Sequence, residues 1–258
     1  MAKPYDQFRI IAKSSEFRGQ FTAIDKKYKT EAESAAMARI SRVVLPDFPH
    51  HVVQRGARGM DVFFSADDRQ EYLSLLSRSA SRHALDFLAW CLMSNHAHFV
   101  VVPHQSTSLS ATFGEAHRRY TRMVNFREGW RGHLWQERFH SYPMDERHLV
   151  AAVRYVEMNP VHAALAKNPG DWEWSSARFH LGLSNGDWLV REGSLFGLVD
   201  DWRNYLTEAD QHNSANYELH LRTGRPLGSV DFVEKLERLT GMILQPKKGG
   251  WQKGKKRK

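Results

Sequence analysis

Residues 85–102 read LDFLAWCLMSNHAHFVVV, and this stretch decides the fold. Two apolar, β-rich runs, 85–92 and 96–102, flank a turn of three residues, a pattern that predicts a β-hairpin. Alternate residues of a strand point to the same face of a sheet. We therefore expect His96 and His98 to project together from one face.

The segments on either side of the hairpin alternate between strand and helix patterns. In chain order, the expected elements are a strand at 50–55, a helix at 69–82, the hairpin, a helix from 108 to about 127, a strand at 138–144 and a helix at 146–158. Asn159 and Pro160 are expected to stop the last helix. This order is typical of an α+β, ferredoxin-like or RRM-like fold, in which an antiparallel sheet carries its helices on one face.

Composition divides the 258 residues into one main domain with extensions. The expected parts are a polar N-terminal extension at 1–38, a catalytic domain at 39–182, a C-terminal helical region at 183–246 and a disordered basic tail at 247–258. Cys91 is the single cysteine, which excludes an internal disulfide and favours a reducing compartment. No apolar run approaches the roughly 18 residues of a membrane span, and no signal-peptide core is evident. We expect a cytoplasmic, nucleoid-associated protein.

The net charge of +8 is concentrated in the tail, which contributes seven of the eight positive charges. A flexible basic tail favours polyanions without selecting a sequence. The residues of the tail expected to contact DNA are Lys253, Lys255, Lys256 and Arg257. The remaining residues, 1–246, are nearly neutral in sum. Any other basic surface must therefore come from local clustering of lysine and arginine side chains.

His96 and His98 form half of a metal site. Neutral imidazoles bind divalent transition ions, and tolerate Mg²⁺ or Mn²⁺ where substrate phosphates complete the coordination. The absence of a neighbouring cysteine or carboxylate cluster argues against a closed structural zinc site. An open site of this kind is what a catalytic ion requires. The alternative is a structural role for the pair.

Tyr120 lies on the helix expected at 108–127 and is a candidate nucleophile, because a tyrosine phenolate can form a covalent bond to phosphorus. The alternative is that Tyr120 packs in the core. Arginines surround it in the sequence and could hold phosphates. They are Arg118, Arg119, Arg122 and Arg127.

Several blocks, taken in order, resemble a known family. They are HVVQRG at 51–56, WCLMSNHAH at 90–98, RYTR at 119–122, GHLWQERF at 132–139, RYVEMNPV at 154–161 and WSSA at 174–177. Together they resemble the REP-associated tyrosine transposases, which belong to the IS200-like branch of the HUH single-tyrosine transposase superfamily. The resemblance covers about residues 39–182, and TGRPLGS at 223–229 is similar to a C-terminal region of some members.

The resemblance implies a metal-dependent endonuclease and strand transferase that acts on single-stranded DNA near hairpin-forming palindromes. His96 and His98 would hold Mg²⁺ or Mn²⁺, and Tyr120 would form a 5′-phosphotyrosine bond and release a 3′-OH. A third metal ligand from the tyrosine helix is usual in the superfamily, which points to Asn125 first and His117 second. A monomer is favoured and a dimer is compatible.

Two other functions are weighed against this one. The first is a catalytically silent DNA-binding or regulatory protein of the same fold, which would bind hairpins without nicking them. The second is a zinc-dependent hydrolase of small substrates. The lack of a third histidine, cysteine or acid at a recognised spacing, and of a nearby general-base carboxylate, speaks against the hydrolase.

Overall fold

The computed structural model describes residues 42–193, 195, 198–207 and 214–245. The predicted N-terminal extension at 1–38 and the basic tail at 247–258 lie outside the described residues, and the four tail residues expected to bind DNA lie there with them.

A four-stranded antiparallel sheet forms the centre of the fold, with the strand order β2-β3-β1-β4. The strands are β1 (His50–Arg55), β2 (Leu85–Leu92), β3 (His96–Pro103) and β4 (His140–Pro143). β2 and β3 form the predicted hairpin, and β3 is an inner strand paired with β1 on its other side. The order along the chain and across the sheet confirms the ferredoxin-like prediction.

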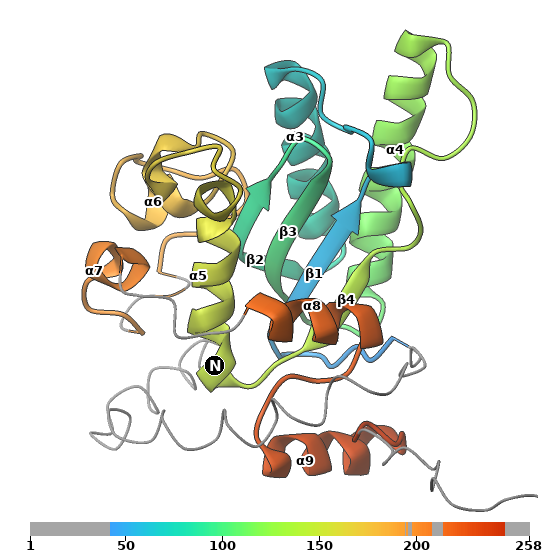
Figure 1. Cartoon of the computed structure of the whole chain (residues 1–258). Helices are drawn as coiled ribbons and strands as arrows, with labels where there is room; N and C mark the ends of the chain where they lie inside the picture. The colour runs from blue at the N-terminus through green and yellow to red at the C-terminus, as the bar shows by residue number, and fades with distance from the viewer. Residues whose placement is uncertain (1–41, 194, 196–197, 208–213, 246–258) are drawn as a thin grey trace, which may run out of the picture.

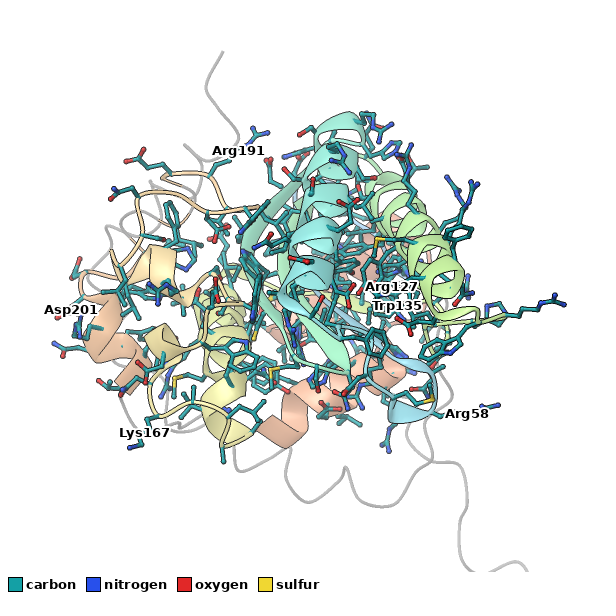
Figure 2. The ribbon with its side chains drawn as sticks, turned by 90° about the horizontal axis from the view of Figure 1, so that it is seen from above. Arg58, Arg127, Trp135, Lys167, Arg191 and Asp201 are labelled. Carbon is teal, nitrogen blue, oxygen red and sulfur yellow. The ribbon has the colours of Figure 1, made fainter. Side chains whose placement is uncertain are left out.

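One face of the sheet is covered by α3 (Ala66–Arg82) and α4 (Ser108–Glu128), which lie side by side (Figures 1 and 2). Ser65 caps α3 in a capping box with Asp68, which explains why the helix begins there. Ala97, Phe99 and Val101 of β3 pack against these helices in the larger core cluster.

The other face of the sheet is covered by α5 (Glu146–His162) and α8 (Ser214–Thr223), seen in front of the sheet in Figure 1. Val53, Val100 and Val102 pack on this side in a second core cluster. The expectation that helices lie on one face only is therefore wrong. Every residue of β3 after His96 is buried, so both faces of the strand need a cover.

Helix α5 continues past the point where it was expected to stop. Pro160 lies inside the helix, which ends at His162, and the N–H of Ala163 still donates to the Asn159 carbonyl. Proline removes one helical hydrogen bond and its ring crowds the carbonyl four residues earlier. Near the end of a helix, this disturbance is confined to the last turn. As a result, Asn159 lies on the helix one turn after Tyr155.

The remaining described elements are short and peripheral to the sheet. They are η2 (Ala57–Gly59), η3 (Pro169–Asp171), α6 (Ala177–His180), α7 (Trp202–Thr207) and α9 (Val230–Thr240). Helix α9 packs through Phe232 and Leu236 on the segment that precedes β1. Among the described residues, no helix is both long and apolar enough to cross a bilayer.

Candidate active site

His96 and His98 project from the same face of β3, as their spacing predicts. Their ring centroids lie 4.9 Å apart, and the rings meet edge to face. His98 is buried, and His96, the first residue of the strand, is partly exposed, so solvent reaches the pair from the His96 end. Their face is the one that α5 and α8 cover.

Hydrogen bonds orient both imidazoles through their Nδ1 atoms. Nδ1 of His96 lies 2.6 Å from Oδ1 of Asn95, and Nδ1 of His98 lies 3.2 Å from Nε2 of His51. Nδ1 of His51 in turn lies 2.9 Å from the hydroxyl of Tyr142. If His98 donates to His51 and His51 donates to Tyr142, Nε2 of His98 carries a lone pair. This second layer of contacts is the usual way in which a protein sets the tautomer of a metal-binding histidine.

Both imidazoles are neutral at physiological pH. Burial, followed by the charge of Arg55, lowers the pKa of His96 to about 4. Burial holds the pKa of His98 well below its usual range, with further lowering by His96, and burial lowers the pKa of His51 to about 3. A neutral imidazole is the form that binds a metal ion.

The ring of Tyr155 from α5 lies against the rings of His98 and His51. Its ring centroid is 5.7 Å from that of His98 and 5.7 Å from that of His51, edge to face in both cases. The ring of Tyr217 from α8 stacks on Tyr155 at 4.6 Å. Burial, followed by the charge of Glu218, raises the pKa of Tyr155 to about 12. The free protein therefore holds this hydroxyl protonated.

Asn159 shares the face of α5 that carries Tyr155, because the two residues are four apart on one helix. Its side-chain Nδ2 donates to the Tyr155 carbonyl at 2.8 Å. That bond uses one of the two N–H donors of the amide, whose oxygen is the atom type that coordinates hard cations such as Mg²⁺.

Tyr120 lies on the opposite side of the sheet from the histidine pair. It is fully buried among Phe63, Tyr72 and Trp135, and its hydroxyl donates to the Val62 carbonyl at 2.6 Å. The structure does not bring Tyr120 to His96 and His98, and it supports the core alternative instead. The physical reason is that α4 packs on the face of β3 that carries Ala97, Phe99 and Val101.

The two residues expected to supply a third ligand lie with Tyr120, away from the pair. Nδ2 of Asn125 donates to the Gly132 carbonyl at 3.0 Å and so holds the loop after α4. Nε2 of His117 lies 2.9 Å from the Tyr72 hydroxyl, in the core between α3 and α4. Both expectations depended on the position of Tyr120, and the structure places neither residue beside His98.

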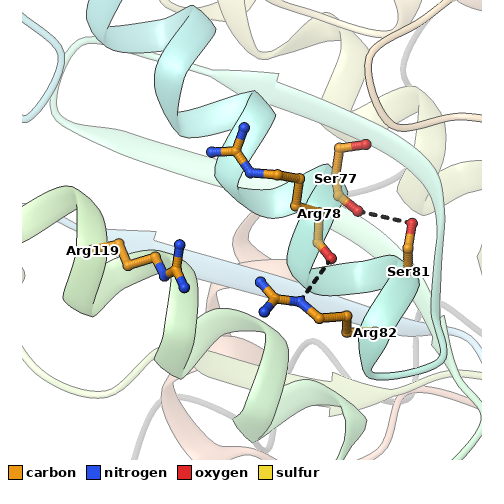
Figure 3. Close-up of a pocket in the computed structure, with 5 residues that line it drawn as sticks. All are labelled: Ser77, Arg78, Ser81, Arg82 and Arg119. Atoms are coloured by element: carbon orange, nitrogen blue, oxygen red, sulfur yellow. Dashed lines mark hydrogen bonds between the residues drawn. The ribbon is translucent and has the colours of Figure 1, made fainter.

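The predicted DNA-binding arginines of α4 lie on its exposed side, also across the sheet from the histidines. Arg119 pairs with Glu115 and lines an open hollow between α3 and α4, together with Ser77, Arg78, Ser81 and Arg82 (Figure 3). Arg127 pairs with the buried Asp68 at the start of α3. Arg118 and Arg122 are exposed. These side chains belong to a different surface from the candidate site.

The donor set suits an open catalytic ion better than a closed structural one. Among the residues that the structure describes, no group of three or more histidine, cysteine, aspartate or glutamate side chains is arranged to hold a metal. Two neutral imidazoles and an amide oxygen leave coordination positions for substrate oxygens. Tyr155 beside them supplies a hydroxyl that can act on such a substrate.

Sequence reasoning missed Tyr155, Asn159 and His51. Tyr155 and Asn159 stand in the block RYVEMNPV, and their spacing of four would have placed them on one helix face. The expected helix stops at 158, before Asn159 and Pro160, and this end hides the signal. His51 carries no spacing signal, since its partner His98 lies on another strand.

Comparison with known proteins gives one match to a family model and several to solved structures. The model described as IS200-like transposase matches residues 47–159. A REP-associated tyrosine transposase bound to a REP hairpin is 18% identical with a TM-score of 0.45, over 60% of this chain and 96% of that one. A transposase candidate from Deinococcus radiodurans R1 is 19% identical with a TM-score of 0.32, over 47% of this chain and 96% of that one. No curated protein matches the chain.

Proposed function

We propose that this chain, whose residues 47–159 match the model of the IS200-like transposases, nicks and rejoins single-stranded DNA with Tyr155 as the nucleophile. The observation that carries the proposal is the contact between Tyr155 and His98, on the face of the sheet where two neutral imidazoles lie. A nucleophile and a metal site must meet at one phosphate, and among the described tyrosines the ring of Tyr155 lies against that of His98.

His96, His98 and Asn159 would hold the ion, for which Mg²⁺ and Mn²⁺ are the candidates. Their two imidazoles and one amide oxygen fit such an ion when substrate oxygens complete the coordination. When bound, the ion would withdraw charge from the phosphoryl oxygens and orient the phosphate. His51 and Tyr142 would fix the orientation of His98 through the hydrogen bonds that link them.

The reaction conserves the phosphodiester energy. The Tyr155 oxygen forms a bond to phosphorus while the bond from phosphorus to the 3′ oxygen breaks, which leaves a 5′-phosphotyrosine and a free 3′-OH. The proton lost by the Tyr155 hydroxyl balances the one taken up by the departing 3′ oxygen. Attack by another 3′-OH on the phosphotyrosine reverses these steps and joins a new strand. No nucleotide cofactor is needed.

The proposed substrate is single-stranded DNA beside a hairpin-forming, REP-like palindrome, as the family resemblance implies. The runner-up function is a catalytically silent DNA-binding protein of the same fold. The presence of both imidazoles, Tyr155 and Asn159 on one face favours the enzyme. A protein that only binds hairpins has no use for a nucleophile held against a metal site.

The test is capture of the covalent adduct. The full chain is incubated with a pool of labelled hairpin oligonucleotides with randomised single-stranded flanks, in the presence of Mn²⁺ or Mg²⁺. We expect an adduct that survives denaturing electrophoresis and is absent from Tyr155→Phe, while hairpin binding is retained. An adduct of normal yield from Tyr155→Phe contradicts the assignment. Hairpin binding by the wild type without any adduct supports the silent alternative.

A further inference from the structure

Arg55 lies on the same face of the sheet as the candidate site. It is the last residue of β1 and stands opposite His96 in the pairing with β3. Its positive charge lowers the pKa of both His96 and His98, after the larger effect of burial. The guanidinium is therefore close enough to act on the charges of this site.

Glu218 of α8 forms an ion pair with Arg55. Nη2 of Arg55 donates to both carboxylate oxygens, at 3.0 Å and 2.9 Å. The two side chains are 45% and 48% exposed, so solvent and solutes reach the pair. An exposed ion pair of this kind contributes little to stability, which makes it easy to exchange.

The same carboxylate also faces the proposed nucleophile. The Tyr155 hydroxyl donates to Oε1 of Glu218 over a long 3.5 Å, and the neighbouring Tyr217 stacks on the Tyr155 ring. One anionic group thus lies between a guanidinium and the tyrosine hydroxyl. A phosphodiester that reacts with Tyr155 would have to place its own anionic oxygens in this position.

We propose that Arg55 binds the scissile phosphate, and that the Glu218 carboxylate occupies the phosphate position until DNA replaces it. The inference rests on the proposed function, since it uses the same phosphate and the same Tyr155. Guanidinium groups bind carboxylates and phosphates through the same paired N–H donors, so the exchange needs no other change in the geometry of Arg55. Departure of Glu218 also frees the Tyr155 hydroxyl from an anionic neighbour.

The first arm of the test measures adduct formation. Arg55→Gln is expected to slow it about 100-fold, the usual effect of removing one donor from a developing phosphate charge. Arg55→Lys keeps the charge and is expected to recover part of the rate. Glu218→Gln is expected to lower the DNA concentration at half-maximal rate several-fold. The matched control is the exposed Arg78–Glu71 pair on α3, whose variants Arg78→Gln and Glu71→Gln are expected to leave the rate unchanged.

The second arm measures binding alone and does not depend on the covalent chemistry. In the Tyr155→Phe background, Arg55→Gln is expected to weaken binding of the labelled single strand, and Glu218→Gln to strengthen it. Equal binding and equal adduct rates in wild type and Arg55→Gln overturn the inference. A loss of rate in Glu218→Gln as large as that in Arg55→Gln also overturns it, because the pair would then be structural. If the wild type forms no adduct but the binding changes hold, the proposed function fails and Arg55 still stands as a phosphate-binding residue.

Discussion

The phenol ring of Tyr155 lies edge to face against the imidazole ring of His98, with 5.7 Å between their centroids. This contact joins a strand to a helix that begins more than forty residues later in the chain. Among the described residues, it places Tyr155 rather than Tyr120 beside His98. The hydroxyl of Tyr120 is bound to the Val62 carbonyl on the other side of the sheet.

Tyr120→Phe is expected to leave adduct formation intact and to lower the free energy of unfolding. The substitution leaves the Val62 carbonyl without the hydrogen bond that Tyr120 donates in the core, at a cost of about 1–3 kcal/mol. Urea denaturation of the variant and the wild type measures this difference. A folded Tyr120→Phe protein that forms no adduct would contradict this prediction and favour Tyr120 as the nucleophile.

Asn159→Ala is expected to raise the Mn²⁺ concentration that gives half-maximal cleavage by at least the roughly 10–100-fold that loss of an outer partner of a metal ligand costs, because it removes the proposed oxygen ligand. A titration of Mn²⁺ in the cleavage assay measures the change. Asn159→Asp restores an oxygen at the same position and is expected to recover most of the affinity. Asn125→Ala is the matched control, since Asn125 holds a loop on the other side of the sheet. An equal effect from both alanine variants would contradict a role for Asn159 as ligand.

Gly56→Ala is expected to destabilise the protein by about 1–3 kcal/mol, because a Cβ at this position is overpacked. It would lie 2.2 Å from the Met60 carbonyl oxygen and 3.2 Å from that of Asn95, both main-chain atoms. Asn95 directly precedes His96, so cleavage is expected to fall as well. Thermal and urea unfolding measure the stability.

Gly114→Ala provides the control for Gly56→Ala. Gly114 lies in α4, where a Cβ meets nothing within 4 Å. Alanine is the better helix former by about 1 kcal/mol, and so this variant is expected to gain stability. A loss of stability in Gly114→Ala, or none in Gly56→Ala, would show that the local packing differs from the structure.

His104→Gln is expected to reduce stability below neutral pH and to have little effect in alkaline solution. Both ring nitrogens of His104 face carboxylates, with Asp47 and Asp86 each at 2.7 Å. Burial lowers the pKa of His104, but the two carboxylates outweigh it and raise the pKa above 6.5. A raised pKa stabilises the folded protein fully below pH 6.5, and this contribution is lost as the pH rises through the folded-state value.

The size of the His104 effect is expected to be about 1 kcal/mol or less, since Asp47 is largely exposed and solvent screens the pair. Urea denaturation of wild type and variant at pH 6 and pH 9 measures it. A difference in stability that is the same at both pH values would show that His104 is not charged in the folded protein.

Much of the fold could be predicted because its signals are local. The β-rich apolar runs at 85–92 and 96–102 and the short turn between them define the hairpin, and the spacing of two puts His96 and His98 on one face. The helix patterns at 69–82 and 108–127 lie within α3 and α4, and the order of elements indicated the ferredoxin-like sheet. The end of α5 could not be predicted in this way, because Pro160 is tolerated in its last turn.

The sequence by itself determined the strands, the histidine pair and the resemblance to a family, since each depends on neighbouring residues or ordered blocks. Only the tertiary structure decided which helix covers which face, and with it the choice of Tyr155 over Tyr120. Both faces of β3 are buried beyond His96, so an amphipathic helix such as α4 or α5 can bury its apolar side against either one. The long-range packing of α5, together with α8 and its Glu218, is what brings a hydroxyl, a guanidinium and two imidazoles to one place.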